Sequence, residues 1–151
     1  MKRGHLVILL VEDDENDIIL VRKAVEAAGA GHSVHAVQDG EQAIQYLQGL
    51  DRFSDRHKYP IPNVVLTDLK MPKIGGFELL HWLRTNPPFS VIPTIMYSSS
   101  ALEKDVREAY QLGANSYITK PTSLSGLVDT LRILYEYWSR CECPPITSRP
   151  V

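Results

Sequence analysis

Short apolar runs alternate five times with amphipathic segments along this chain. The first run, LVILLV at 6–11, is continuous and rich in β-branched residues, as expected for a strand covered on both faces. Further strands are predicted at 33–38, 64–67, 92–97 and 116–119, and each is followed by a helical pattern. Strands and helices in this order predict an α/β fold, a parallel sheet with helices on both faces.

Capping signals and helical periodicity define the segments between the runs. Asp39 with Gln42, and Ser100 with Glu103, form capping-box patterns that predict helix starts. Gly29 and Gly113 predict helix ends, as does the run 86–88, which holds two prolines. The residues expected to face the core are Ile18, Val21, Val25 and Ala28 in the first helix, Phe77, Leu80 and Leu83 in the third, Leu102, Val106 and Ala109 in the fourth, and Leu124, Leu127, Leu131, Leu134, Tyr135 and Trp138 in the last.

The remaining segments are expected to carry no core. Residues 49–63 are polar and hold two prolines, so we predict a surface loop. The chain has 151 residues, a length typical of one domain, and we expect no room for a second catalytic or DNA-binding unit. We expect one domain over 1–139 and a flexible, proline-rich tail over 140–151.

Charge and composition exclude several classes of protein. Lys and Arg number 16 and Asp and Glu 18, a balance that argues against nucleic-acid binding. No apolar run approaches the ~18 residues of a membrane span, and 6–11 is too short for a signal peptide. Cys141 and Cys143 are expected to be reduced surface thiols of a cytoplasmic protein, with a peripheral metal or redox role left open. The five histidines do not cluster, so metal binding by them is not expected.

Groups that handle a metal–phosphate complex follow four of the five predicted strands. The acidic run 12–14 follows the first strand, Asp68 the third, the serines at 98–100 the fourth, and Lys120 the fifth. Ligands of parallel α/β sheets bind outside the carboxyl ends of the strands. Carboxylates suit Mg²⁺, lysine and hydroxyl groups suit phosphate oxygens, and Asp can accept a phosphoryl group.

Each of these elements also has an ordinary structural explanation. Acidic residues at a helix start complement the helix dipole, a lone Asp after a strand serves a turn, and serines cap helices. Their occurrence together, at one edge of one sheet, favours the functional interpretation.

Four stretches in fixed order resemble the receiver domains of response regulators in two-component signalling, over about residues 5–139. They are ILLVEDDENDIILV (8–21), VVLTDLKMPKIGGFELL (64–80), IPTIMYSSS (92–100) and LGANSYITKP (112–121). The resemblance implies a flavodoxin-like (βα)5 fold, a doubly wound parallel sheet with strand order 2-1-3-4-5. It also implies a signalling protein that catalyses only its own phosphorylation and dephosphorylation.

The resemblance assigns roles by position. Asp68 resembles the phosphoryl acceptor, and Glu12 and Asp13 resemble the acidic pair for Mg²⁺, Asp13 directly and Glu12 through water. The main-chain carbonyl of Lys70 resembles the third protein ligand of that metal, beside Asp13 and Asp68.

Three further residues resemble the groups that bind and report the phosphoryl group. Ser98 resembles the hydroxyl that contacts it, Lys120 the lysine that pairs with it, and Tyr117 the aromatic that changes rotamer on activation. The Lys120–Pro121 peptide bond is expected to be cis by the same resemblance.

Within the family, the chain is most similar to single-domain regulators that pair with cyanobacterial and bacterial phytochrome histidine kinases. The loop before the third strand, the GANSYITKP segment and the aromatic 134–138 stretch carry this similarity. The expected partners are a sensor histidine kinase of phytochrome type and an unidentified downstream protein, with no nucleic acid and no membrane. Tyr137 lies off the apolar stripe of the last helix, which suggests a homodimer through the fourth helix, fifth strand and fifth helix.

Three positions depart from the simplest family pattern. Glu12 is the longer of the two acids allowed at its position, and Tyr97 is bulky for a strand interior and needs a hydroxyl partner if buried. The Lys70 side chain is either a solvated surface lysine or a group that modulates attack of water on the phosphoryl group.

Three other functions fit this sequence less well. A phosphatase of the haloacid-dehalogenase type would place Asp-x-Asp after the first strand, whereas this chain has Asp68-Leu69-Lys70 after the third. A phosphorylation-independent binding module would lack some of the chemical positions, and all of them are filled here. A DNA-binding regulator would need more than the twelve residues that follow Ser139.

Overall fold

Five parallel strands form one sheet in the order β2-β1-β3-β4-β5, as predicted. The computed structural model describes residues 5–29 and 31–146, to which all structural statements refer. The strands are β1 (Val7–Val11), β2 (Ser33–Val37), β3 (Val64–Thr67), β4 (Thr94–Ser98) and β5 (Ser116–Thr119). The helices are α1 (Glu15–Ala28), α2 (Gly40–Gln48), α3 (Gly76–Thr85), α4 (Glu103–Gln111) and α5 (Leu124–Arg140), with short 3-10 turns at Asp51–Phe53 and Phe89–Val91.

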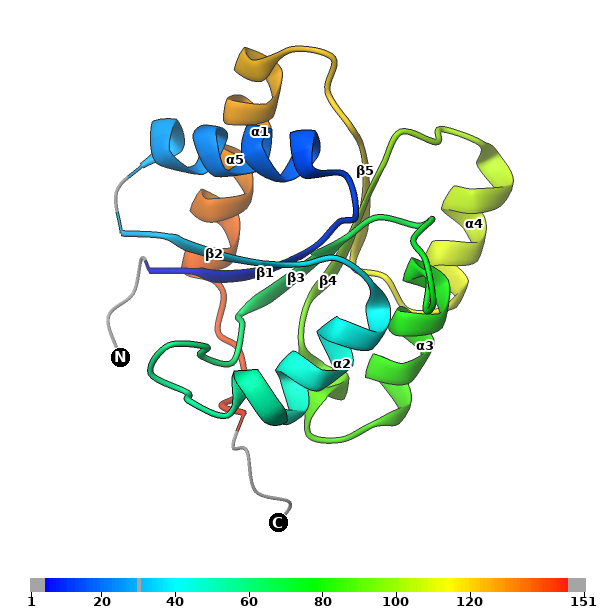
Figure 1. Cartoon of the computed structure of the whole chain (residues 1–151). Coiled ribbons are helices and arrows are strands. Elements are labelled where there is room, and N and C mark those ends of the chain that lie inside the picture. Colours follow the sequence, from blue (N-terminus) through cyan, green and yellow to red (C-terminus); the bar gives the residue numbers. More distant parts are fainter. Residues whose placement is uncertain (1–4, 30, 147–151) are drawn as a thin grey trace.

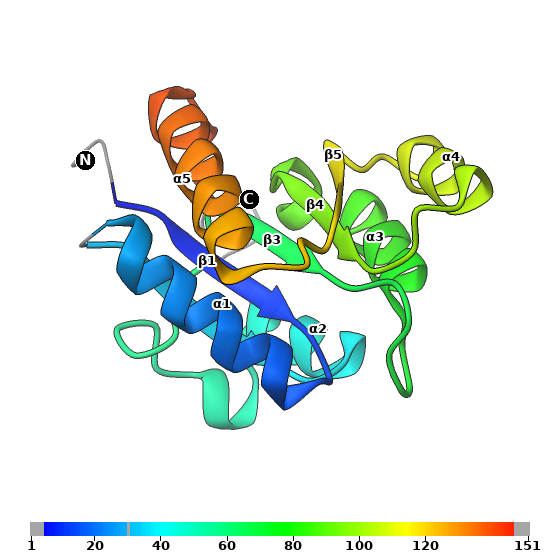
Figure 2. The ribbon, with the colours of Figure 1, turned by 90° about the horizontal axis from the view of Figure 1, so that it is seen from above.

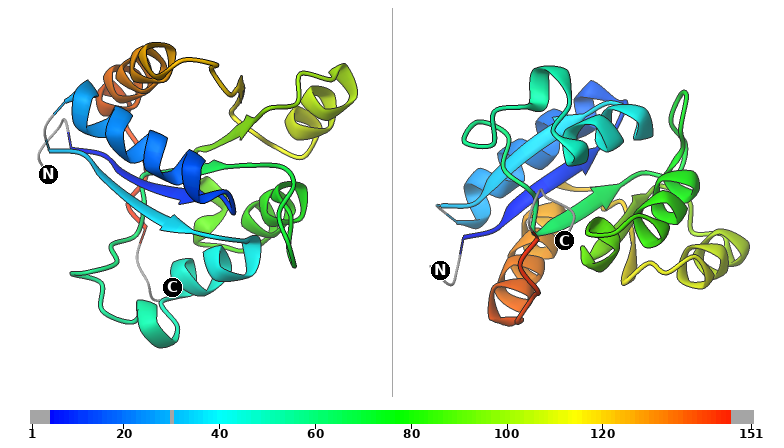
Figure 3. Two further views of the ribbon diagram at one scale, coloured as in Figure 1. Left: turned by 45° about the horizontal axis from the view of Figure 1, so that its top comes forward. Right: turned by 90° about the horizontal axis from the view of Figure 1, so that it is seen from below.

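Helices cover the sheet on both faces, so its central strands are apolar on both sides. In β1, Ile8 and Leu10 face the cluster beneath α1 and α5, while Leu9 and Val11 face the cluster beneath α2 and α3. Figure 1 shows α1 and α5 on one side of the sheet, and Figure 2 shows them side by side from above. Figure 3 shows α2 and α3 on the opposite face. This arrangement explains why the LVILLV run shows no alternation of polar residues.

The predicted inward faces of α1 and α5 are largely confirmed. Val21 and Val25 are buried in α1, as are Leu127, Leu131 and Tyr135 in α5. Leu124 is the exception in α5, because it stands in the first turn and is 46% exposed. Among the described residues no helix is both long enough and apolar enough to cross a bilayer.

The predicted start of α4 is wrong. The helix begins at Glu103 with Leu102 in the capping position, and Ser100 makes no cap to its first turn. Instead the Ser100 hydroxyl donates to the Asp105 carboxylate at 2.6 Å and accepts from the Leu102 N–H at 3.3 Å. Leu102 is therefore 57% exposed rather than inward, and Ala109 is the buried residue of α4.

The segment 49–63 is more than the surface loop that its polar composition predicted. Phe53 is 3% exposed and contacts the ring of Tyr46, and Tyr59 lies edge-on to both rings. Arg56 donates to the main-chain carbonyls of Tyr46, Leu47 and Tyr59, so it ties the loop to the end of α2. The composition of the loop did not predict this aromatic contact, because Tyr46, the partner of Phe53 and Tyr59, lies in α2.

The segment after α5 returns toward the α2 and α3 side of the sheet. Ile146 packs against the core cluster there, and Cys141 and Cys143 are free thiols. Residues 147–151 of the predicted flexible tail lie outside the described residues. Tyr137 is 61% exposed, which confirms that it lies off the buried stripe of α5.

Candidate functional site

The sheet brings the predicted site residues together by extending its hydrogen bonding one residue past the strands. The N–H of Glu12 donates to the Val37 carbonyl at 2.9 Å, and the N–H of Asp68 donates to the Val11 carbonyl at 3.0 Å. The N–H of Lys120 donates to the Ser98 carbonyl at 2.8 Å. Each residue is thus fixed at the same edge, where the carboxyl ends of parallel strands meet.

Close contact with the start of α3 fixes the main chain at Asp68. A Cβ added at Gly76 would lie 2.1 Å from the Asp68 carbonyl oxygen, so only glycine fits there without a shift. The Gly76 N–H donates to the Leu69 carbonyl at 2.8 Å, and Asp68 Oδ1 accepts from the Leu69 N–H at 2.6 Å. The sequence marked Gly75-Gly76 only as a helix start, and this positioning role was missed.

Three carboxylates form a cluster that fits a hard divalent cation. Glu12, Asp13 and Asp68 each offer an oxygen, and these oxygens lie within 4.8 Å of one another. Glu12 is 1% exposed, and its Oε2 lies 2.9 Å from Lys120 Nζ without the geometry of a hydrogen bond. Burial raises the pKa of Glu12 to about 7 against the opposing effect of Lys120. Three carboxylates whose oxygens lie this close together, one of them buried, suit a metal ion.

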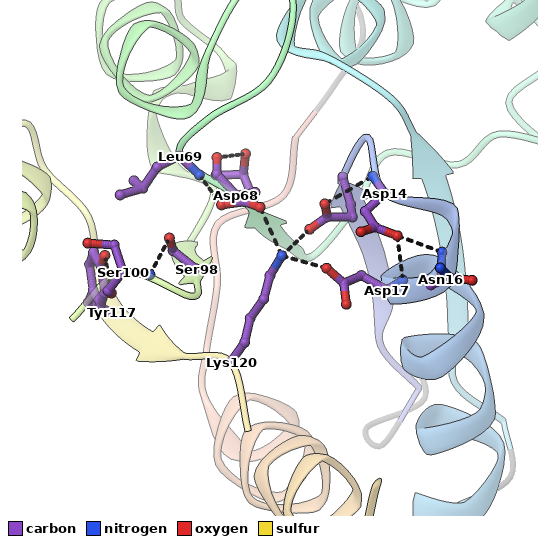
Figure 4. Close-up of polar contacts among 11 residues, drawn as sticks. Asp14, Asn16, Asp17, Asp68, Leu69, Ser98, Ser100, Tyr117 and Lys120 are labelled. Carbon is purple, nitrogen blue, oxygen red and sulfur yellow. Dashed lines mark hydrogen bonds and ion pairs between the residues drawn. The ribbon is translucent and has the colours of Figure 1, made fainter. Parts of the chain in front are cut away.

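Lys120 lies among three carboxylates. Its Nζ is 2.9 Å from Glu12 Oε2, 2.7 Å from Asp17 Oδ2 and 2.9 Å from Asp68 Oδ2 (Figure 4). Burial alone would lower the pKa of Lys120, but the hydrogen bonds with Asp17 and Asp68 and the close approach of Glu12 outweigh it and raise that pKa. The buried Tyr97 ring lies beneath the ammonium, 5.5 Å from ring centre to Nζ.

The structure corrects one expectation at Lys120, the cis bond to Pro121, and adds one residue, Asp17, to the site. The Lys120–Pro121 bond is trans, since the cis bond of the described residues is Pro87–Pro88; trans is the lower-energy form of most X–Pro bonds. Asp17 was not predicted as part of the site, because it is 103 residues from Lys120 in the sequence. Its acidic position one turn after Asp14 in α1 was the available signal.

Ser98 and Tyr117 meet at one residue of the β4–α4 connection. The Ser98 hydroxyl accepts from the Ser100 N–H at 3.1 Å, and the Tyr117 hydroxyl donates to the Ser100 carbonyl at 2.8 Å (Figure 4). A cavity of about 420 Å³ opens beside them and is lined by Asp68, Lys70 and the residues from Ser98 to Leu102. Asp68 therefore borders a space that a small group can enter.

Comparison with known proteins settles the family. The model described as the response regulator receiver domain matches residues 8–132. This chain belongs to the response regulator receiver family. The matched stretch includes β2 to β5, all of β1 except Val7, and every residue of the site described above.

Curated relatives and solved structures agree with this assignment. The chain is 33% identical to Response regulator Rcp1 of Synechocystis, over 87% of this chain and 88% of Rcp1. It is also 33% identical to the probable methanogenesis regulatory protein FilR2 of Methanothrix harundinacea, over 87% of this chain and 83% of FilR2.

Solved structures of phytochrome regulators share the fold. The phosphorylated cyanobacterial phytochrome response regulator RcpA superposes with a TM-score of 0.83 at 33% identity, over 93% of this chain and 99% of RcpA. The Mn²⁺-bound form of Rcp1 superposes with a TM-score of 0.79 at 32% identity, over 93% and 99% of the two chains. The receiver is thus similar to phytochrome-associated regulators, as the sequence indicated.

Proposed function

We propose that this receiver accepts a phosphoryl group on Asp68 from the phosphohistidine of a sensor histidine kinase, and later hydrolyses it. In the transfer an Asp68 carboxylate oxygen forms a bond to phosphorus, and the bond from phosphorus to the histidine nitrogen breaks. The observation that carries the proposal is the position of Asp68 at an open cavity, with Lys120 on one side and the other acids beside it.

Several residues around Asp68 would stabilise the negative charge of the phosphoryl oxygens. Glu12, Asp13, Asp68 and the Lys70 carbonyl would hold Mg²⁺, which neutralises charge on the phosphoryl oxygens when bound. The Lys120 ammonium and the Ser98 hydroxyl supply hydrogen bonds to the same oxygens. The Leu69 N–H restrains Asp68 Oδ1, so the carboxylate is oriented before the phosphoryl group arrives.

The bonds to Ser100 offer a route from the phosphoryl group to the surface. If the Ser98 hydroxyl turns toward the phosphoryl group, it gives up the Ser100 N–H that it now accepts from. The carbonyl of the same residue holds the Tyr117 hydroxyl, so movement of Ser100 releases the tyrosine to change rotamer. This is a local charge event that biases a two-state element, with Ser98 and Tyr117 as the switch.

The proposed output is a contact with another protein. Tyr110 of α4 and Ile133 and Tyr137 of α5 are exposed apolar side chains, and we propose that these helices, with β5, contact a second copy or a downstream partner. Similarity to RcpA favours a kinase of the phytochrome type, in the cytoplasm. We assign the receiver to 1–139 and a tail to 140–151, consistent with the family match at 8–132.

The decisive test is phosphoryl labelling of Asp68. With Mg²⁺ and acetyl phosphate or a phosphorylated histidine kinase, wild-type protein should gain an acid-stable, base-labile phosphoryl group, and Asp68→Asn should gain none. Asp129→Asn is the matched control, because it removes the same charge from an exposed site on α5, where Asp129 pairs with nearby Arg132. Labelling of Asp68→Asn at the wild-type rate would overturn the assignment, and a wild-type protein that takes no label would favour a phosphorylation-independent module.

A further inference from the structure

Lys120 has one more carboxylate partner than the proposed chemistry uses. Glu12 and Asp68 belong to the acidic cluster, but Asp17 comes from the first turn of α1 and is the nearest of the three partners of Lys120. The Lys120 ammonium donates hydrogen bonds to Asp17 and Asp68, and the Glu12 carboxylate forms an ion pair with it at 2.9 Å. A phosphoryl oxygen that approaches Lys120 therefore competes with three nearby carboxylates for the ammonium.

The contact between Asp17 and Lys120 is sheltered from solvent. The Lys120 side chain is 13% exposed and that of Asp17 is 28% exposed, so water and salt screen the pair less than an ordinary surface ion pair. The Tyr97 ring lies on another side of the ammonium and limits the directions in which Lys120 can turn. The contact with Asp17 and the Tyr97 ring together hold Lys120 in a defined position.

Local structure holds the Asp17 carboxylate in place before any ligand arrives. The Asp14 side chain accepts hydrogen bonds from the N–H groups of Asn16 and Asp17, which fixes the first turn of α1 (Figure 4). Asp17 projects from this capped turn toward Lys120, which follows β5. The contact thus joins the beginning of α1 to the end of β5 across the site.

We infer that Asp17 is a positioning residue that holds Lys120 in the unphosphorylated protein and competes with the phosphoryl group for it. This inference rests on the proposed function of Asp68. Of the three partners, Asp17 is the one that lies outside the acidic cluster, so it is the contact that the phosphoryl group replaces. Asp17 therefore restrains phosphorylation and makes the α1–β5 contact sensitive to the state of Asp68.

The test measures binding of beryllofluoride, a phosphoryl analogue that adds to an aspartate, by ¹⁹F NMR at saturating Mg²⁺. Asp17→Asn keeps the shape of the side chain and removes its charge, so the affinity for beryllofluoride should rise about fivefold. Asp17→Glu keeps the charge and should stay close to wild type. Glu15→Gln is the matched control: it removes the same charge from an exposed residue of the same turn, and its affinity should not change.

Each outcome supports or overturns the inference. A gain confined to Asp17→Asn supports it, because damage to the fold would lower affinity rather than raise it. Unchanged or weaker binding by a folded Asp17→Asn protein overturns it, and so does an equal gain in Glu15→Gln, which would show a general charge effect. If wild-type protein binds no beryllofluoride and takes no phosphoryl label, the proposed function fails and this inference fails with it.

Discussion

Substitution of Gly76 by alanine tests how the start of α3 sets the position of Asp68. The added Cβ would lie 2.1 Å from the Asp68 carbonyl oxygen and 2.9 Å from the Leu69 Cα. Both neighbours are main-chain atoms, so no side-chain rotation can relieve the contact. The start of α3 and the Asp68–Leu69 segment must move apart by about 1.3 Å, from 2.1 Å to about 3.4 Å, to restore ordinary van der Waals contact.

The expected cost follows from two opposing contributions. Overpacking of this kind destabilises a fold by ~1–3 kcal/mol, while alanine in place of glycine returns at most ~1 kcal/mol of helix propensity. The net loss in the free energy of unfolding is about 1–2 kcal/mol, which lowers the unfolding temperature of a chain of this size by about 2–8 °C. Because a displacement of ~1 Å at a reacting group can cost on the order of 100-fold in rate, labelling of Asp68 should slow by on the order of 10- to 100-fold.

Thermal unfolding and acetyl phosphate labelling, measured on the same preparation, check both effects. Gly75→Ala is the matched control, since its added Cβ would approach one main-chain atom, the Leu69 carbonyl oxygen, at 3.0 Å. It should lose less stability and keep most of the labelling rate. A Gly76→Ala protein that unfolds and labels like wild type would refute the proposed link between α3 and the acceptor.

Three further predictions concern other parts of the molecule. Burial, with His5 nearby, lowers the pKa of His32 below its ordinary 6.5, so the folded state resists protonation: stability is fully present above that value and falls as pH drops through the folded pKa. In urea unfolding from pH 5 to 8, His32→Gln should lose less stability at low pH than wild type; an identical profile would contradict this. Lys70→Ala should lengthen the lifetime of the aspartyl phosphate if the ammonium assists water, and an unchanged decay would leave Lys70 a solvated lysine. Sedimentation should show a dimer that weakens in Tyr137→Ser; a wild-type monomer with and without phosphorylation would reject the α4–β5–α5 interface.

The sequence was sufficient for the fold and for the convergence of the main site residues. Apolar runs without alternation indicated strands covered on both faces, and polar residues at their ends indicated one shared edge, which the hydrogen bonds of Glu12, Asp68 and Lys120 confirm. These features are local in sequence, because a parallel sheet places all carboxyl ends of its strands on the same side.

Features that depend on contacts between distant segments were not predicted. The acidic position of Asp17, one turn after Asp14, does not by itself indicate that Lys120 will lie 2.7 Å away. The capping pattern at Ser100 was overridden because the serine hydroxyl donates to the Asp105 side chain in the first turn of α4. The burial of Phe53 likewise depends on a ring supplied by another element. For Asp17 and Phe53 the partner comes from another element, whereas Ser100 exchanged one local contact for another.

The charges at the strand ends make the proposed phosphorylation depend on a bound divalent cation. Four carboxylates, those of Glu12, Asp13, Asp17 and Asp68, share this edge with the ammonium of Lys120. A phosphoryl group brings further negative charge into this surplus, and one lysine with three anionic partners cannot offset it. We therefore expect labelling by acetyl phosphate to require a divalent cation, with no detectable product after EDTA treatment and recovery on addition of Mg²⁺. Metal-independent labelling at a comparable rate would mean that Lys120 alone suffices, and that the acidic cluster has another role.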